Sequence, residues 1–370
     1  ISPYPPLKGG ISKETEVLYH ILSDKFDIKI FSFYKLYPTF LYPSIQQDDI
    51  TLVYDNKRVL SSISSTNIKS WIKTVNLVLV NNTTHIVFRY WTPLFIPMYL
   101  FILNRLKSKN SKIKVFCICD NIYPHERIIF DNTLIKYFFL KIDRFMVMST
   151  ESKLKLNNII NDKTKIVQSF LPLKFLFDSK FSQLSSLKKI NIIKPKLMLL
   201  FFGFIRNYKG LDILLEALRK VSHLDIKLLI AGECFTKDNK YKKIINRYHL
   251  NDKIIWHNYY IPDKDIKYYF SACDAVVLPH KKISQSGIIP IAYEFNKLVI
   301  CSNIPSFKEN IIDNKTGYLF ENNNSDSLCS KIQYIYKSHD FNNSREFIKD
   351  YKKRYSNQNI IRDFKKLVSV

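Results

Sequence analysis

The chain has 370 residues, more than one hydrophobic core usually serves, so we expect two domains. Hydrophobic residues make up 46% and aromatic residues 14% of the sequence, which excludes an intrinsically disordered chain. The formal net charge of +25 is spread along the chain, and it suits a nucleotide diphosphate, an anionic glycolipid or a membrane surface. Because no nucleic-acid motif is recognisable, we expect no specific nucleic-acid binding.

The cysteines and the apolar stretches indicate where such a chain would work. None of the six cysteines has metal-ligand spacing, and Cys117 and Cys119 fall on one face of an expected strand. We therefore expect buried, reduced thiols in a cytoplasmic protein, which could also lie peripherally on the inner face of the cytoplasmic membrane. No signal peptide is visible, and the longest apolar stretch, 91–103, is too short to span a bilayer. We expect the first strand to be truncated, since the sequence opens on ISPYPP.

The first half alternates short apolar strands with amphipathic helices, a rhythm that favours a doubly wound parallel sheet. Ligands of such sheets lie beyond the carboxyl ends of the strands. We predict strands at 28–33, 51–53, 85–89, 113–119, 144–148 and 165–168, and helices at 13–22, 68–79, 96–106, 134–140 and 153–159. The segment 91–109 is amphipathic and ends in three cations. It could be a core helix, which we favour, or a basic helix that lies on a membrane surface.

Two loops of this half could approach a ligand. Gly9 and Gly10 stand between the first strand and the first helix, where they allow close backbone approach or simply form a tight turn. Asp120 and His125 follow the strand at 113–119, at the expected rim of a cleft. A purely structural role for His125 is the alternative. A polar stretch at 178–196 then predicts the linker between domains at 1–185 and 190–345, with terminal helices at 346–370.

The stretch 197–219, LMLLFFGFIRNYKGLDILLEALR, is the most informative part of the chain. A buried strand at 197–202 ends at Gly203, a turn carries Arg206 and Lys209, and an amphipathic helix follows Gly210. A helix N-terminus beside two cations can hold a diphosphate. A solvated turn with two surface cations is equally compatible with these residues.

The remaining sequence continues the alternation of strands and helices. We predict strands at 227–231, 253–256, 275–278 and 299–301, and helices at 266–271, 325–338, 345–355 and 357–368, with one more that ends at 295. Glu233 follows the first of these strands. Gln285, Ser286 and Gly287 precede the helix that ends at 295, where they predict either a second nest of donors for an anion or a plain N-cap.

The segment GFIRNYKGLDILLEA resembles the start of the nucleotide-binding domain in retaining glycosyltransferases of family 4, which have the GT-B fold. This resemblance implies two Rossmann-like domains that face each other across a cleft, with the C-terminal helix crossing back to the N-terminal domain. It also implies that Gly203, Arg206 and Lys209 face the diphosphate of a sugar nucleotide. Gly9 and Gly10 would line the cleft as donor-binding residues, and Glu233 and Gly287 would also contact the donor.

The chain departs from that family at the donor sugar. Asp120 replaces a histidine that approaches the sugar in the family, whereas His125 matches a second histidine. Ile283 and Ile291 occupy the places of two family glutamates. The sequence at this place resembles a subgroup of the family that reads Ser-Gln-Ser-Gly. Gln285 and Ser286 are then expected at the sugar and Glu294 at the ribose. The segment 303–320 resembles the family's next loop and helix, with Glu309 in a first helical turn and Gly317 in a turn.

The resemblance implies transfer of a hexose-type sugar, with retention, from a nucleotide diphosphate sugar to a glycan or lipid-linked acceptor of bacterial surface polysaccharide synthesis. No cofactor and no metal are expected. Arg206 and Lys209 would stabilise the leaving diphosphate, and Asp120 and His125 complete the catalytic set. The basic N-terminal domain would contact an anionic membrane. Because both glutamates are missing, the alternative is a catalytically weak or inactive subunit that binds a nucleotide sugar. A nucleotide-sugar epimerase fits less well.

Overall fold

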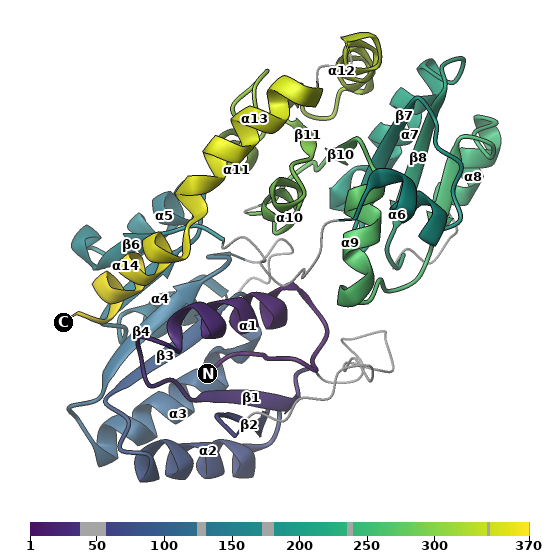
Figure 1. The fold of residues 1–370 in the computed structure, drawn as a ribbon. Coiled ribbons are helices and arrows are strands. Elements are labelled where there is room, and N and C mark those ends of the chain that lie inside the picture. The colour runs from purple at the N-terminus through teal and green to yellow at the C-terminus, as the bar shows by residue number, and fades with distance from the viewer. Residues whose placement is uncertain are drawn as a thin grey trace. The chain divides into compact units, whose positions relative to one another are not determined.

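The computed structural model describes residues 1–37, 57–123, 131–171, 181–234, 240–283, 285–338 and 341–369 (Figure 1). The chain divides into two compact units, residues 1–172 with 355–370 (unit 1) and residues 173–354 (unit 2). Each unit carries parallel sheets with helices packed against them. The predicted α/β class with two parallel-sheet domains is therefore confirmed.

Unit 1 contains a two-stranded and a four-stranded parallel sheet. The first pairs β1 (Ile30–Lys35) with β2 (Val59–Ser64). The second runs in the order β3 (His85–Tyr90), β4 (Lys114–Cys119), β5 (Arg144–Val147) and β6 (Ile166–Gln168). The first two residues join the sheets, because Ser2 N donates to Phe31 O at 3.3 Å and Arg89 N donates to Ile1 O at 3.0 Å. The chain start thus lies between β1 and β3, the central position of a doubly wound sheet.

The helices of unit 1 cover these strands. They are α1 (Gly10–Leu22), α2 (Ile68–Val80), η1 (Pro93–Phe95), α3 (Ile96–Lys109), α4 (Asp131–Phe139), α5 (Thr150–Asn157), η2 (Lys163–Lys165) and α14 (Asn357–Val368). Ile96, Tyr99 and Ile102 of α3 are fully buried in the main core, as expected of a core helix. The terminal helix α14 packs on β5, β6 and α1 of the same unit (Figure 1).

Unit 2 is built on one six-stranded parallel sheet. Its strands are β7 (Leu197–Phe202), β8 (Ile226–Ala231), β9 (Ile254–His257), β10 (Ala275–Leu278), β11 (Leu298–Ser302) and β12 (Gly317–Phe320), in the order β12-β11-β10-β7-β8-β9. The chain runs outward from β7 to one edge and then from β10 to the other. The topological switch point therefore lies between β7 and β10, the position at which Rossmann-like sheets bind ligands.

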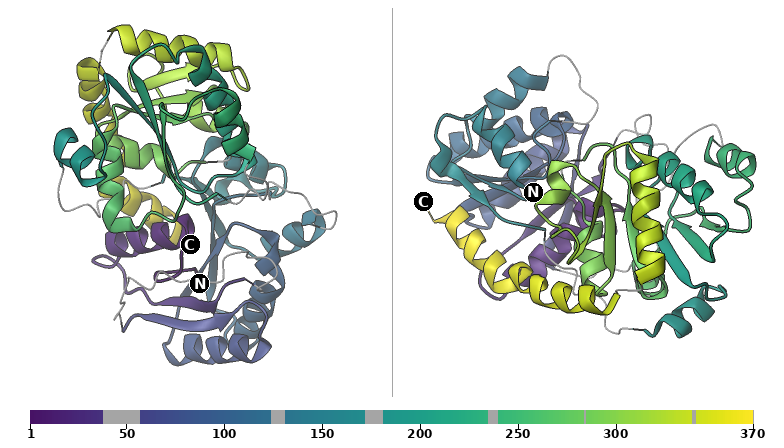
Figure 2. Two further views of the ribbon diagram at one scale, coloured as in Figure 1. Left: turned by 90° about the vertical axis from the view of Figure 1, so that its right-hand side faces the viewer. Right: turned by 90° about the horizontal axis from the view of Figure 1, so that it is seen from above.

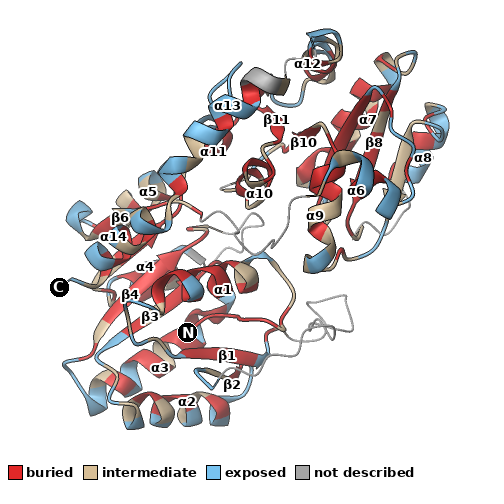
Figure 3. Ribbon diagram, viewed as in Figure 1, coloured by how far each residue is buried: buried red, intermediate tan, exposed pale blue. Residues whose placement is uncertain are grey.

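Helices lie on both faces of this sheet (Figure 2). They are α6 (Gln183–Lys189), η3 (Asn207–Lys209), α7 (Leu211–Lys220), α8 (Lys240–Arg247), α9 (Asp263–Ala272), α10 (Ile288–Glu294), α11 (Pro305–Lys308), α12 (Ser325–Ser338), α13 (Phe341–Tyr351) and η4 (Lys352–Tyr355). Leu199 and Phe201 of β7 share a core with α7, α8 and α12. Phe202 instead packs on Phe270 of α9, with ring centroids 5.0 Å apart. The strands are the most buried part of the unit (Figure 3).

Several sequence expectations differ from the structure. The polar stretch at 178–196 contains α6, which packs on α9 through Gln183, so unit 2 begins before the predicted linker. Unit 2 also extends to residue 354, beyond the predicted end at 345. The strand β2 and the helix α8 were not predicted, and the strand expected at 51–53 lies outside the described residues.

Two expectations at the end of unit 2 were wrong. Glu309 follows α11 at its C-terminal end and does not stand in a first helical turn. Gly317 starts β12, and a side chain there would lie 2.4 Å from Val299 O on the neighbouring strand. Close packing of two strands, not a turn conformation, therefore requires this glycine.

Candidate functional site at the switch point of unit 2

The turn between β7 and α7 carries two cations at the carboxyl end of the central strand. The buried strand ends at Gly203, and the helical turn η3 brings Lys209 back against it, so that Lys209 Nζ lies 3.5 Å from Phe202 O. Arg206 precedes η3 and is exposed. The two cations thus stand on one short turn ahead of a ten-residue helix.

Lys209 is a buried ammonium group. It is 8% exposed, and burial together with the nearby charge of Arg206 lowers its pKa to about 8. In the described part of the chain, no carboxylate forms an ion pair with Lys209. Buried charges in proteins are normally paired, so an unpaired buried cation at a ligand-binding edge is suited to an anion from outside.

Two glycines allow this turn to form. Gly203 has φ +93, and a side chain there would lie 2.9 Å from Lys209 Nζ. Gly210 has φ +70, and its side chain would collide with Pro279 O at 1.8 Å. Both positions combine a left-handed backbone with a close approach that only glycine permits. The backbone and the contact with Lys209 at Gly203, and the backbone and the contact with Pro279 at Gly210, therefore account for both glycines of the fragment Gly-x5-Lys-Gly.

The loop after β10 forms the second side of the site. Its residue His280 is 1% exposed, and burial together with the charge of Lys209 lowers its pKa well below the ordinary value. His280 Nδ1 has no hydrogen-bond partner among the described residues. Next to it, Lys281 pairs with Asp212 in the first turn of α7 at 2.7 Å, which ties the two loops together. Sequence reasoning assigned no role to His280, although its place directly after an apolar strand was the signal.

The segment before α10 lies beside Gly203, because Ile288 Cδ1 is 3.9 Å from the position of a side chain there. Ser286 is buried, and its hydroxyl accepts a hydrogen bond from Ile288 N at 3.3 Å. Gln285 and Gly287 are half-buried on either side of it. Gly287 is the N-cap residue of α10, and the hydroxyl of Ser286, one residue before it, is engaged within the protein.

The two predicted glutamates of unit 2 lie in different places. Glu233 follows β8, and its carbonyl accepts from Ile205 N at 2.8 Å, so this loop runs alongside the Arg206 turn. Glu294 is the last residue of α10, with its carboxylate 3.9 Å from Lys352 Nζ. Glu294 therefore stands at the opposite end of α10 from Ser286, and the ribose contact assigned to it remains a prediction.

The predicted residues of unit 1 form a separate group. Gly9 has φ +125 and caps α1, which begins at Gly10. Asp120 is 2% exposed and is engaged by Arg89, and its expected place at the rim of a cleft remains a prediction. His125 lies outside the described residues.

Within the described ranges, no group of three or more His, Cys, Asp or Glu side chains could hold a metal ion. In the same part of the chain, no helix is long and apolar enough to cross a membrane. The six cysteines are free, and all but Cys234 are buried.

Comparison with known proteins identifies the class of fold and finds a family match within unit 2. A sucrose-phosphate synthase from Thermosynechococcus elongatus superposes with a TM-score of 0.71 at 16% identity, covering 96% of this chain and 90% of that one. Anabaena HepE in complex with UDP-glucose gives a TM-score of 0.70 at 13% identity, covering 85% and 86%. The fold is therefore that of GT-B glycosyltransferases. Residues 183–354, which lie in unit 2, match the family described as glycosyl transferases group 1.

A curated relative is similar over a shorter stretch. It is a GDP-mannose:glycolipid 4-beta-D-mannosyltransferase from Xanthomonas campestris pv. campestris, 31% identical over 103 residues. That stretch covers 28% of this chain and 29% of the relative. The chain thus spans about three tenths of the length of the curated relatives it matches.

Proposed function

We propose that this protein is a glycosyltransferase that takes a sugar from a nucleotide diphosphate sugar. The observation that carries the proposal is Lys209, a buried cation that pairs with no carboxylate of the described residues, at the switch point of the sheet in unit 2, where the group 1 family match lies. A diphosphate would supply the missing negative charge, with Arg206 on the same turn and the N-terminus of α7 behind it. Gly203, Glu233 and the 285–287 segment lie around this turn as further donor contacts.

The chemistry that these residues offer is electrostatic. As the bond from sugar to phosphate breaks, negative charge grows on the leaving diphosphate, and fixed cations nearby lower the barrier. Loss of one such contact is expected to cost on the order of 10²-fold in rate. No step of this mechanism requires a metal or a cofactor, and metal-independent transfer remains a prediction.

The proposal extends to the acceptor and to the stereochemistry of transfer. The name of the Xanthomonas relative specifies a glycolipid acceptor, which supports a lipid-linked or glycan acceptor and a role in surface polysaccharide synthesis. An enzyme with such an acceptor would work at the cytoplasmic face of the membrane, and the net charge of +25 favours contact with an anionic membrane. The name of that relative specifies a beta linkage in its product. For this protein, the anomeric configuration of the product, compared with that of the donor, decides whether transfer proceeds with the proposed retention.

The alternative is a nucleotide-sugar-binding subunit with little or no turnover. Ile291 is 2% exposed in α10, where the resembled family has a glutamate, and Glu294 is turned toward Lys352. The described part of α10 thus brings no carboxylate to the turn at Ser286. A protein of this kind would bind the nucleotide sugar at Lys209 and yet release no product.

The test is a thermal-shift screen against UDP, GDP, ADP, CMP and dTDP. A ligand at 100 times its dissociation constant adds about 2.7 kcal/mol of stability. We expect one nucleotide to stabilise the wild type and Lys282→Ala, which removes an exposed cation of the neighbouring loop, but not Arg206→Ala or Lys209→Met. Stabilisation by none of the five would refute the proposed function. Release of sugar from the matching nucleotide sugar then separates the enzyme from the inactive subunit.

A further inference from the structure

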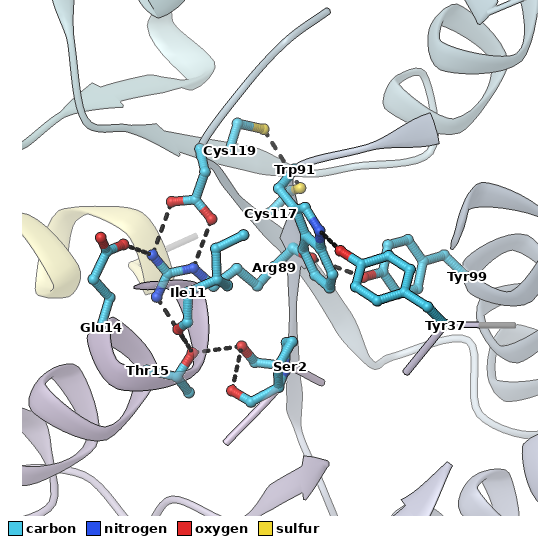
Figure 4. A network of polar contacts seen from close by, with 12 residues as sticks. Ser2, Ile11, Glu14, Thr15, Tyr37, Arg89, Trp91, Tyr99, Cys117 and Cys119 are labelled. Atoms are coloured by element: carbon cyan, nitrogen blue, oxygen red, sulfur yellow. Dashed lines mark hydrogen bonds and ion pairs between the residues drawn. The ribbon is translucent and has the colours of Figure 1, made fainter. Parts of the chain in front are cut away.

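Unit 1 contains a buried ion-pair network centred on Arg89 (Figure 4). Arg89 is the penultimate residue of β3, and its side chain is 2% exposed. Its Nε and Nη2 donate to the two carboxylate oxygens of Asp120 at 2.7 and 2.8 Å, a bidentate fork. Nη2 also donates to Glu14 Oε2 at 2.5 Å, and Nη1 donates to Thr15 Oγ1 at 3.3 Å.

This network joins three separate parts of the unit. Arg89 lies on β3, Asp120 follows β4, and Glu14 and Thr15 lie in the early turns of α1. Thr15 extends the network to Ser2, with hydroxyl oxygens 2.6 Å apart. The backbone of Arg89 is itself held, because its carbonyl accepts from Tyr99 Oη at 2.8 Å. One guanidinium therefore fixes α1 to the carboxyl ends of two strands.

The guanidinium remains charged in this environment. Burial alone would lower the pKa of Arg89, but the carboxylates of Asp120 and Glu14 together raise it above the ordinary value. Lysine could not replace this arrangement, since a single ammonium cannot form a planar fork to Asp120 and also reach α1. A change at Arg89 would leave buried carboxylates without their cation, which is strongly unfavourable.

Arg89 holds groups that the sequence analysis expects to contact the ligand. Gly9 and Gly10 start α1 one turn before Glu14, and Asp120 is itself a partner of the guanidinium. Displacement of catalytic or binding groups by about 1 Å can lower a rate by about 10²-fold. We propose that Arg89 is a positioning residue for transfer, which holds Asp120 and the Gly9–Gly10 turn in one arrangement without contacting the substrate.

The test compares Arg89→Lys with Arg58→Lys. Arg58 forms an ion pair of similar length, 2.8 Å, with Asp27 in the same unit, but the two side chains are 49% and 82% exposed. At a temperature where circular dichroism shows both variants folded, we expect Arg89→Lys to lower kcat at least tenfold. Its affinity for the nucleoside diphosphate should stay within twofold of wild type, because that site belongs to unit 2. Arg58→Lys should match wild type in both measurements. A kcat of Arg89→Lys within twofold of wild type would overturn the inference.

Hydrogen exchange provides a readout that needs no turnover. Because transfer is itself proposed, the kinetic readout rests on the proposed function, whereas exchange rates do not. Arg89→Lys should accelerate amide exchange at least tenfold in residues 10–16 and 117–123, with no change in α2 or in unit 2. If exchange in those two segments were as slow in Arg89→Lys as in the wild type, this would contradict the positioning role of Arg89 even if the wild type proves inactive.

Should Arg89→Lys fail to fold, Glu14→Gln decides the question. Glutamine keeps an oxygen for Arg89 and loses the charge, so this variant is expected to fold, to lower kcat severalfold and to accelerate exchange in residues 10–16 alone. Wild-type kcat and exchange in Glu14→Gln would then refute the role of Arg89.

Discussion

Replacement of Lys209 by methionine should stabilise the protein in the absence of ligand. The pKa of Lys209 is lowered from 10.5 to about 8, mainly by burial. Each pKa unit corresponds to 1.36 kcal/mol, so the folded protein at pH 7 bears a penalty of about 3 kcal/mol for holding this ammonium. Methionine has a similar length and no charge. Lys209→Met should therefore raise the free energy of unfolding by up to about 3 kcal/mol at pH 7.

The pH dependence gives this prediction its sign. Between about pH 8 and pH 10.5 the unfolded chain binds a proton at Lys209 that the folded protein has released, so wild-type stability rises with pH in that window. The advantage of Lys209→Met should then shrink to about 1 kcal/mol at pH 10. Urea unfolding followed by tryptophan fluorescence at pH 7 and pH 10 measures both values.

Lys281→Met is the matched control. Lys281 belongs to the same site but already pairs with Asp212 at 2.7 Å, so its loss leaves a carboxylate without a partner. This variant should be less stable than wild type. Two results would refute the description of Lys209 as a buried cation without an anionic partner in the ligand-free protein. In one, Lys209→Met is less stable than wild type at pH 7, and in the other, its stability difference from wild type does not change with pH.

Two further predictions concern the packing around the site. Gly210→Ala should destabilise the protein by more than about 1 kcal/mol and abolish nucleotide-induced stabilisation. The added carbon would meet Pro279 O at 1.8 Å, and the backbone at this position has φ +70. Thermal melting with and without nucleotide measures both effects. Lys297→Met should lower the free energy of unfolding in urea by about 1–3 kcal/mol, because Lys297 Nζ donates to Ser271 O and Cys273 O at the end of α9. This loss is expected even though burial lowers the pKa of Lys297. An increase in stability would contradict a stabilising role of these two hydrogen bonds.

The strands that position the site could be predicted because their sequence pattern is strong. The apolar run at 197–202 is β7 with the predicted bounds, and Ala275–Leu278 is β10. Both strands are buried on two faces, so their sequences are continuous and apolar. In contrast, β2 (VLSSIS) was missed, since serines at 61, 62 and 64 interrupt its apolar pattern. Ser62 and Ser64 are nonetheless buried, because Thr74 and Ser70 provide hydrogen bonds to them.

The site was only partly predictable for a different reason. At the Gly203–Lys209 turn the residues alone were compatible with a diphosphate site or with a solvated turn, and the resemblance to a known family favoured the diphosphate site. The state of Asp120 depends on Arg89, which lies 31 residues away in the sequence, and the pairing of Glu294 depends on Lys352, 58 residues away. Periodicity and motifs describe neighbours in the chain and carry no information about such partners. Burial and pairing of a charged side chain therefore required the fold.

Each unit has a buried cation near the centre of its sheet, and the two cations differ in their partners. In unit 1, Arg89 lies beside the central position of the sheet, and the carboxylates of Asp120 and Glu14 surround it. In unit 2, Lys209 lies at the switch point between β7 and β10, and no carboxylate of the described residues pairs with it. A neutralised cation stabilises its surroundings and gains little from an anion, whereas an unpaired one gains the full interaction when an anion arrives. The anionic donor is therefore expected in unit 2, and unit 1 is left to a ligand recognised by other means, as a sugar acceptor would be.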